Sequence, residues 1–431
     1  FDEETMPEAY QGKNMSYSAY VLGSGYDKVE KTPAWAAKIT GIPEKKIEEL
    51  AREIAETKPL YVVQGWGPQR RSNGEWTAWA IMAAGRRSGI WSKSTRIGTN
   101  NGTREGSNSV SLTSMPQGTN PVKASIPCFL FADAIDHGTE MTSKNAGVKG
   151  VDKLSVNIKY MINYAGNCLT NQHGGINQMH PILADESKCE TIVVVDTTLA
   201  PSARYADYLL PSCLNMEEPD WTLNGDSNIA YVIFDNKAIP PYGESKGIYD
   251  ICAGVAAKLG VEQEFTEGRT EYQWLEYLYA ESRKNVPELP PTLEQAFQMG
   301  VYKKHFPENH IAYKDFRDDP EAHPLDTPSG KIEIYSPRLA ELAATWQLAP
   351  GQEITPLPVW IDSPEGALSP QRRTYPLQLI GHHYKQRTHS TYGNCSWLQE
   401  VAPQELWINP VDARARGIRL GDRVKVYNNR G

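Results

Sequence analysis

A short run of β-branched residues constrains the fold of this chain more than any other feature. Four consecutive β-branched apolar residues fill positions 192–195, between Thr191 and Asp196. A strand that is apolar throughout, without polar alternation, is typical of a parallel sheet with both faces covered. A second strand is predicted over residues 158–164, directly before a glycine-containing turn. The sequence therefore predicts an α/β fold with a buried parallel sheet.

Helices alternate with strands on either side of this run. Apolar residues spaced three and four apart predict helices, and short apolar runs predict strands. The expected helices cover residues 42–56, 73–84 and 248–259, the last capped by Gly260, and a short one begins at Pro337. The expected strands cover residues 60–64, 330–335, 377–380, 405–408 and 423–427. The last three indicate that an all-β unit opens after residue 374.

Composition excludes several classes of protein. The chain has 431 residues, 40% of them hydrophobic, and a net charge of −8, so it is globular and has no broad basic surface for nucleic acid. Its six cysteines are never closer than 21 positions, which excludes the clustered cysteines of a zinc or iron–sulfur site. No GxGxxG or P-loop motif follows a predicted strand. The abrupt ends at Phe1 and Gly431 lead us to expect a fragment of a longer protein.

Three turns at predicted strand ends are candidate ligand sites, because backbone N–H groups approach phosphates at the carboxyl ends of parallel strands. They cover residues 64–70, 166–171 and 195–198. Asp196 is placed to accept hydrogen bonds from a ribose hydroxyl or from guanine, Arg70 to neutralise a phosphate, and Trp66 to stack on a flat ring. The alternatives are that Asp196 only caps the next segment and that Trp66 lies in the core.

The densest polar segment covers residues 381–390 and holds three of the nine histidines. A zinc site would need a fourth ligand beside these three imidazoles, and their spacing matches no common zinc motif. Lys385, Arg387 and the imidazoles would more readily bind an anion or a heterocycle. A solvated basic loop is the remaining alternative.

Six motifs in order resemble the molybdopterin oxidoreductase family, also called the dimethyl sulfoxide reductase family. They lie within residues 65–75, 163–173, 205–211, 327–336, 383–394 and 407–422. Among them are the runs Gly65-Trp66-Gly67-Pro68-Gln69-Arg70, Tyr164-Ala165-Gly166-Asn167-Cys168-Leu169 and Tyr205-Ala206-Asp207-Tyr208-Leu209-Leu210-Pro211. The resemblance covers nearly the whole chain and is nearest to the catalytic subunits of anaerobic, membrane-associated reductases. Residues 85–97 depart from the family pattern, because three arginines and a tryptophan replace an apolar helix end.

The resemblance implies a Rossmann-like parallel sheet domain that binds molybdopterin guanine dinucleotide, followed by the beginning of a C-terminal β-barrel of the double-psi type. Two such dinucleotides would share one molybdenum, whose protein ligand is expected upstream of Phe1. A [4Fe-4S] cluster is implied in the full-length protein, with ligands that are not in this chain. The cofactor-binding residues carried over by motif are Trp66, Gly67, Arg70, Asn171, Val195, Asp196, His383, Tyr384, Lys385, Gln386, Arg387, Thr388, His389 and Ser390.

The resemblance also implies a domain order. Residues 1–35 would end a preceding α/β domain, and residues 36–340 would form the nucleotide-binding α/β domain, with a β excursion near 215–245. Residues 341–373 would be a linker, and residues 374–431 a partial β-barrel.

The implied reaction is oxygen-atom transfer from a sulfoxide, such as dimethyl sulfoxide, or from an N-oxide, in anaerobic respiration. An Fe–S electron-transfer subunit would supply electrons, together with a membrane anchor subunit, at the periplasmic face of the bacterial inner membrane. Export by the twin-arginine route is implied. The fragment alone would not catalyse, because the metal ligand lies outside it. The alternative from another class is a non-catalytic α/β scaffold that binds a guanine nucleotide.

Overall fold

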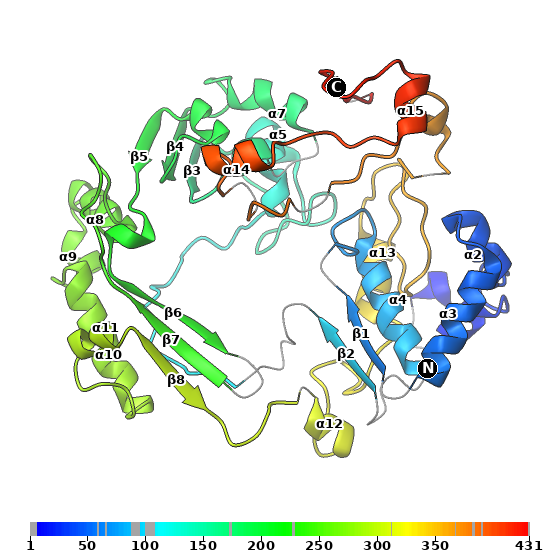
Figure 1. The fold of residues 1–431 in the computed structure, drawn as a ribbon, viewed down its shortest axis with the longest axis horizontal. Coiled ribbons are helices and arrows are strands. Elements are labelled where there is room, and N and C mark those ends of the chain that lie inside the picture. Colours follow the sequence, from blue (N-terminus) through cyan, green and yellow to red (C-terminus); the bar gives the residue numbers. More distant parts are fainter. Residues whose placement is uncertain are drawn as a thin grey trace. The chain divides into compact units, whose positions relative to one another are not determined.

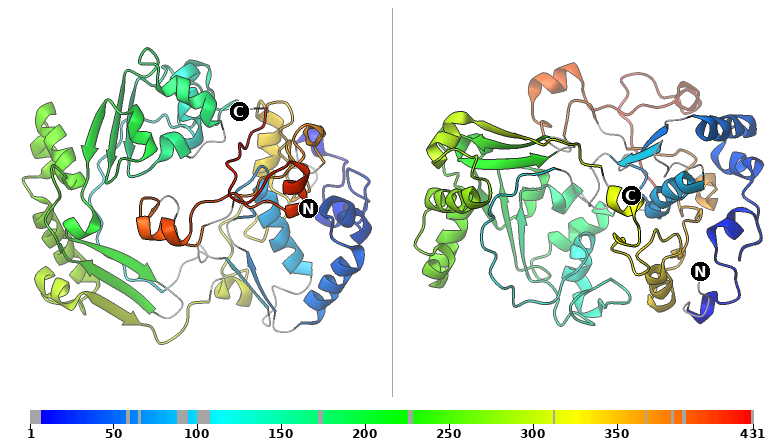
Figure 2. Two further views of the ribbon diagram at one scale, coloured as in Figure 1. Left: turned by 45° about the horizontal axis from the view of Figure 1, so that its top comes forward. Right: turned by 90° about the horizontal axis from the view of Figure 1, so that it is seen from below.

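The chain folds into two compact units. The computed structural model describes residues 7–57, 60–64, 67–87, 95–99, 108–171, 175–225, 229–311, 313–366, 368–381, 384–388 and 391–429. The first unit comprises Phe1–Ala124, Thr142–Asp152 and Pro211–Pro364, and the second comprises Ser125–Met141, Lys153–Leu210 and Glu365–Gly431. Figure 1 labels the elements of both units, and Figure 2 gives two further views.

The first unit opens with helices around a parallel strand pair. Its elements are η2 (Glu8–Tyr10), α1 (Tyr17–Val21), α2 (Pro33–Thr40), α3 (Glu44–Glu56), β1 (Leu60–Gln64), α4 (Gly74–Arg87) and β2 (Thr95–Thr99). β1 and β2 pair in parallel, with Leu60 opposite Thr95 and Gln64 opposite Thr99. The predicted helices here and the strand over 60–64 are confirmed, and β1, α4 and β2 form a β–α–β unit.

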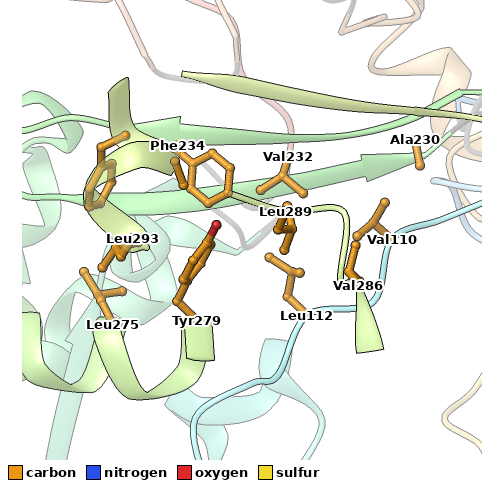
Figure 3. Packing of buried hydrophobic residues seen from close by; sticks show 12 residues of the cluster. Val110, Leu112, Ala230, Val232, Phe234, Leu275, Tyr279, Val286, Leu289 and Leu293 are labelled. Atoms are coloured by element: carbon orange, nitrogen blue, oxygen red, sulfur yellow. The ribbon is translucent and has the colours of Figure 1, made fainter. Parts of the chain in front are cut away.

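A second sheet of the first unit is antiparallel. It consists of β6 (Asp220–Gly225), β7 (Ile229–Asp235) and β8 (Val301–His305), in that order. Alternate residues of β7, namely Ala230, Val232 and Phe234, are at most 2% exposed and face a helical layer (Figure 3). Tyr279 of that layer packs against Phe234 and donates a hydrogen bond of 2.8 Å to the Pro290 carbonyl, which satisfies its buried hydroxyl.

The first unit contains further helices. They are η6 (Asn215–Glu217), α8 (Ile248–Leu259), α9 (Glu262–Thr266), α10 (Glu271–Asn285), α11 (Leu293–Met299), α12 (Lys314–Asp318) and α13 (Pro337–Thr345). Gly260 ends α8 at a φ of +74°, where a side chain would be strained, so the predicted C-cap is confirmed. Ser336 caps α13 through the Leu339 N–H, with Pro337 in the first turn as predicted.

The second unit contains the apolar run that first indicated the fold. Its elements are η3 (Cys128–Leu130), α5 (Phe131–His137), η4 (Gly138–Glu140), β3 (Tyr160–Tyr164), α6 (Cys168–Asn171), α7 (Ile176–Leu183), β4 (Thr191–Asp196), η5 (Pro201–Tyr205), β5 (Tyr208–Pro211), η7 (Pro370–Arg373), α14 (Ser396–Val401) and α15 (Pro410–Ala415). The strand order is β3-β4-β5, with β3 parallel to β4. Ile192 and Val194 of β4 are 1% exposed and pack with α5 and α7 on one face of the sheet. The architecture is therefore mixed α/β.

Four predicted strands are wrong. Residues 330–335, 377–380, 405–408 and 423–427 have irregular backbone without ladder pairing in the described part of the chain. Strand character depends on a hydrogen-bonded neighbour, which an apolar sequence pattern does not supply. Around 330–335, local bonds take the place of a ladder, since Thr327 donates its hydroxyl to the Lys331 carbonyl and Ser329 N–H donates to Glu333. The barrel and the domain boundaries stay predictions.

Two further features concern membranes and metals. Among the described residues, no helix combines the length and apolar character that a membrane span needs. The same residues contain no group of three His, Cys, Asp or Glu side chains arranged to hold a metal ion.

Candidate functional site

The carboxyl ends of β3 and β4 meet at one edge of the parallel sheet. Tyr164 lies opposite Val195, and the Ala165 N–H continues the ladder with a bond of 3.0 Å to the Val195 carbonyl. Val195 itself is 3% exposed, so its side chain belongs to the core and only its backbone can serve a ligand. Two of the three predicted turns, after β3 and after β4, are therefore neighbours in space.

Local bonds shape the turn after β3. Asn163 is 7% exposed, and its amide donates to the Gly166 carbonyl at 2.7 Å. Ala165 has a φ of +52°, which costs a non-glycine residue about 1–2 kcal/mol. The turn then enters the short helix α6, whose last residue, Asn171, is exposed. A strained but buttressed turn of this kind is common where a ligand is bound.

Asp196 closes β4 and presents one uncommitted carboxylate oxygen. Its Oδ1 accepts the Thr197 N–H at 2.7 Å, so the carboxylate does cap the next residue, as the alternative interpretation holds. Over the described residues, no hydrogen bond or ion pair reaches Oδ2. Thr197 and Thr198 beside it are exposed. Such an oxygen can accept from a ribose hydroxyl or from the paired N–H groups of guanine.

The turn after β1 lies in the first unit. The Arg70 N–H donates to the Gly67 carbonyl at 3.2 Å, and the Arg70 side chain is exposed. A Cβ added at Gly67 would meet nothing within 4 Å, so its backbone is open to a ligand. At Gly74 a Cβ would lie 2.6 Å from the Pro68 carbonyl oxygen, so only glycine fits where this turn meets α4. Trp66 lies outside the described residues.

The basic segment after residue 383 is held by the chain about 17 residues farther on. The Tyr384 hydroxyl donates to the Pro403 carbonyl, and Arg387 Nη1 donates to Gln404 Oε1 at 2.9 Å. Thr388 is exposed and pairs with Thr391 in an isolated bridge, Lys385 is exposed, and Gln386 is half-buried. His383, His389 and Ser390 lie outside the described residues.

The two described cations of this segment, Lys385 and Arg387, are not neutralised by a described carboxylate. In the ranges that the structure describes, no carboxylate forms an ion pair with Lys385 or Arg387. The Arg387 guanidinium lies 5.6 Å from the Tyr384 ring centroid, which orients it without neutralising it. Two cations without a described acidic partner suit an anion such as a diphosphate.

The sequence did not reveal one residue of the strand-end site. Ser202, in η5, is 0% exposed, and both its N–H and its hydroxyl donate to Asn167 Oδ1, at 2.9 and 2.7 Å. Asn167 stands in a predicted turn, but no local pattern marks a serine 35 positions later as its partner. Only the fold brings the two together.

Comparisons with known proteins identify the family of this chain. The family model described as "Molybdopterin oxidoreductase" matches residues 22–258, and the one described as "Molydopterin dinucleotide binding domain" matches residues 377–431. The chain therefore belongs to the molybdopterin oxidoreductase family, and the predicted resemblance is confirmed.

Relatives of this chain are reductases. It is 51% identical over 434 residues to dimethyl sulfoxide reductase DmsA of Escherichia coli (strain K12), and 52% identical over 434 residues to DmsA of Haemophilus influenzae. It is 29% identical over 458 residues to trimethylamine-N-oxide reductase of Haemophilus influenzae. These alignments cover 100%, 100% and 98% of this chain, but only 53%, 53% and 52% of the relatives. The chain spans about half the length of the curated relatives it matches.

Proposed function

We propose that this chain is part of the catalytic subunit of a molybdenum-dependent anaerobic reductase that acts on a sulfoxide or an N-oxide. Identity above 50% to two dimethyl sulfoxide reductases over the whole chain is the observation that carries the proposal. The overall reaction consumes two electrons and two protons, breaks the S–O or N–O bond, and yields the sulfide or amine together with water. Dimethyl sulfoxide is the substrate we expect.

The residues present fit a dinucleotide of molybdopterin and guanine. In the second unit, Asp196 Oδ2 is an acceptor for guanine or ribose. In the first unit, the open backbone at Gly67 would admit a phosphate, and Arg70 would add a positive charge beside it. Lys385 and Arg387 offer donors to a second anionic group. The bound molybdenum–pterin group would supply the two-electron oxygen-atom chemistry, while the protein supplies binding, orientation and electrostatics.

Each side chain would have a distinct part in holding this group. Asp196 would fix the guanine or ribose end by hydrogen bonding, since an ionised carboxylate only accepts. Asn171, exposed at the end of α6, would contact the nucleotide in the second unit, and Trp66 would contact a nucleotide in the first unit. Gln386 and Thr388 would line the pterin side with His383, Tyr384, His389 and Ser390. The backbone of Val195 continues the ladder beneath them.

The wider assembly is part of the proposal. We infer a [4Fe-4S] cluster in the full-length protein, an Fe–S electron-transfer subunit and a membrane anchor subunit, at the periplasmic face of the inner membrane after twin-arginine export. The Rossmann-like sheet and the double-psi barrel belong to the same proposal. The match of the dinucleotide-binding model to residues 377–431 supports the barrel.

Turnover of the full-length protein tests the function. The protein is purified anaerobically from a host that makes the cofactor, and oxidation of a reduced dye is followed after addition of dimethyl sulfoxide or trimethylamine N-oxide. We expect dye oxidation that depends on one of these substrates. Protein that carries cofactor but oxidises the dye with neither substrate would contradict the proposed substrate class.

A further inference from the structure

One amide oxygen joins the turn after β3 to the loop after β4. Asn167 Oδ1 accepts the Ser202 N–H at 2.9 Å and the Ser202 hydroxyl at 2.7 Å. Because a backbone N–H can only donate, the oxygen of the amide must face Ser202. Ser202 is completely buried, so water cannot replace these bonds.

The loop that carries Asp196 is thereby held at both ends by the same turn. At its beginning, the Ala165 N–H bonds to the Val195 carbonyl at 3.0 Å. At its end, Ser202 bonds to Asn167. Between these anchors lie the exposed residues 197–199, with Leu199 81% exposed. The loop lacks packing of its own there, so its course depends on the two anchors.

We propose that Asn167 and Ser202 are positioning residues that hold the Asp196 loop in the conformation that binds the nucleotide end of the cofactor. The inference rests on the proposed function, because it assigns Asp196 to that nucleotide. Neither residue would contact the ligand. Their effect is to keep the Asp196 carboxylate in place before the nucleotide arrives, which lowers the ordering cost of binding.

The chain offers a matched control in Thr170. Its hydroxyl donates to the same Asn167 oxygen at 2.9 Å, and the residue is 8% exposed. Thr170 lies in α6, on the same side of the link as Asn167. Its Oγ1 also lies 3.4 Å from Ser202 Oγ, but each hydroxyl has one proton and donates it to Asn167, so this longer contact contributes little to the link between the two turns. S202A and T170V each remove one buried hydroxyl donor to Asn167. Both Ser202–Asn167 bonds remain in T170V, whereas S202A removes the shorter of the two.

The experiment uses the full-length protein loaded with cofactor. Wild type, S202A and T170V are incubated at a fixed temperature, and guanine nucleotide retained on the protein is measured over time after gel filtration and acid hydrolysis. Loss of one buried hydrogen bond predicts release from S202A on the order of fivefold faster than from wild type. Release from T170V should match wild type. Thermal melting of the cofactor-free forms measures the purely structural cost, which should be equal in the two variants.

Two results would overturn the positioning role. The first is equal acceleration in both variants, which would make the network merely structural, and the second is a release rate in S202A equal to wild type. Wild-type protein that holds no guanine nucleotide would overturn the proposed function itself, and this role with it. That outcome is seen before any variant is compared, so the two failures are distinguishable.

Discussion

Two glutamates packed over the start of α8 predict that the first unit loses stability as the pH rises. A Cβ placed on Gly247 would lie 2.7 Å from Glu218 Oε2 and 3.2 Å from Glu271 Oε1. Glu218 Oε2 is buried and has no hydrogen-bond partner among the residues described. Burial first, and then nearby carboxylates led by Glu218, raise the pKa of Glu271 to about 7. The charged groups that face the pair are Glu217, Asp220, Asp250 and Lys237.

The direction of the pH effect follows from this raised pKa. The stabilisation by protonated Glu271 is fully present below its ordinary pKa of 4.5 and is lost as the pH rises toward about 7. The full rise in the pKa of Glu271, from 4.5 to about 7, corresponds to about 3 kcal/mol of folding stability. Partial solvent exposure of the side chain reduces this to about 1–2 kcal/mol. A charge at the first position of α10 recovers about 0.3–1 kcal/mol from the helix dipole. The net cost of ionisation is therefore about 1 kcal/mol.

E271Q removes this cost. We expect the variant to match wild type near pH 5 and to melt about 2–3 °C higher at pH 8, measured by thermal unfolding of the full-length protein. Glu276 is exposed on the same helix, so E276Q changes the same charge and should shift melting at neither pH. An E271Q variant that gains nothing at pH 8, or gains as much at pH 5, would refute the reasoning.

The remaining predictions concern the site and one tight turn. D196A should lower the guanine-nucleotide content of the full-length protein more than tenfold, since a hydrogen bond to a charged group contributes about 1.5–3 kcal/mol; E186A, at an exposed acid of the same unit, should leave it unchanged. Gly150 has a φ of +79°, and an added Cβ would lie 1.9 Å from the Lys123 carbonyl oxygen, so G150A should destabilise by about 3 kcal/mol or more in thermal unfolding. G243A, where φ is +61° and nothing lies within 4 Å, should cost about 1 kcal/mol. Equal melting of the two glycine variants would contradict the steric argument.

Local signals were enough for the elements whose own residues determine their conformation or burial. The β4 run was predictable because Ile192 and Val194 need burial whatever their neighbours are. The end of α8 was predictable because Gly260 alone tolerates its φ. The predicted strand also ended at Asp196, and β4 ends at that residue in the structure.

Strand pairing and contacts with residues distant in the sequence could not be predicted from local sequence patterns. Trp407 lies in a predicted strand but is 73% exposed in irregular backbone, because residues 405–408 join no strand ladder in the described ranges. Conversely, the segment around Arg96 departs from the family pattern, yet Thr95–Thr99 forms β2 because β1 supplies the ladder. Ser202 was missed for the same reason, since its partner Asn167 is reached only through the fold.

Cofactor analysis of the full-length protein decides the assignment of this chain to a molybdenum reductase. Protein purified anaerobically from a competent host is assayed for molybdenum by elemental analysis and for GMP after acid hydrolysis. We predict about one molybdenum and two guanine nucleotides per chain, because the cofactor carries the chemistry that the protein lacks. Well-folded protein from that host with neither molybdenum nor GMP would contradict the assignment to a molybdenum reductase.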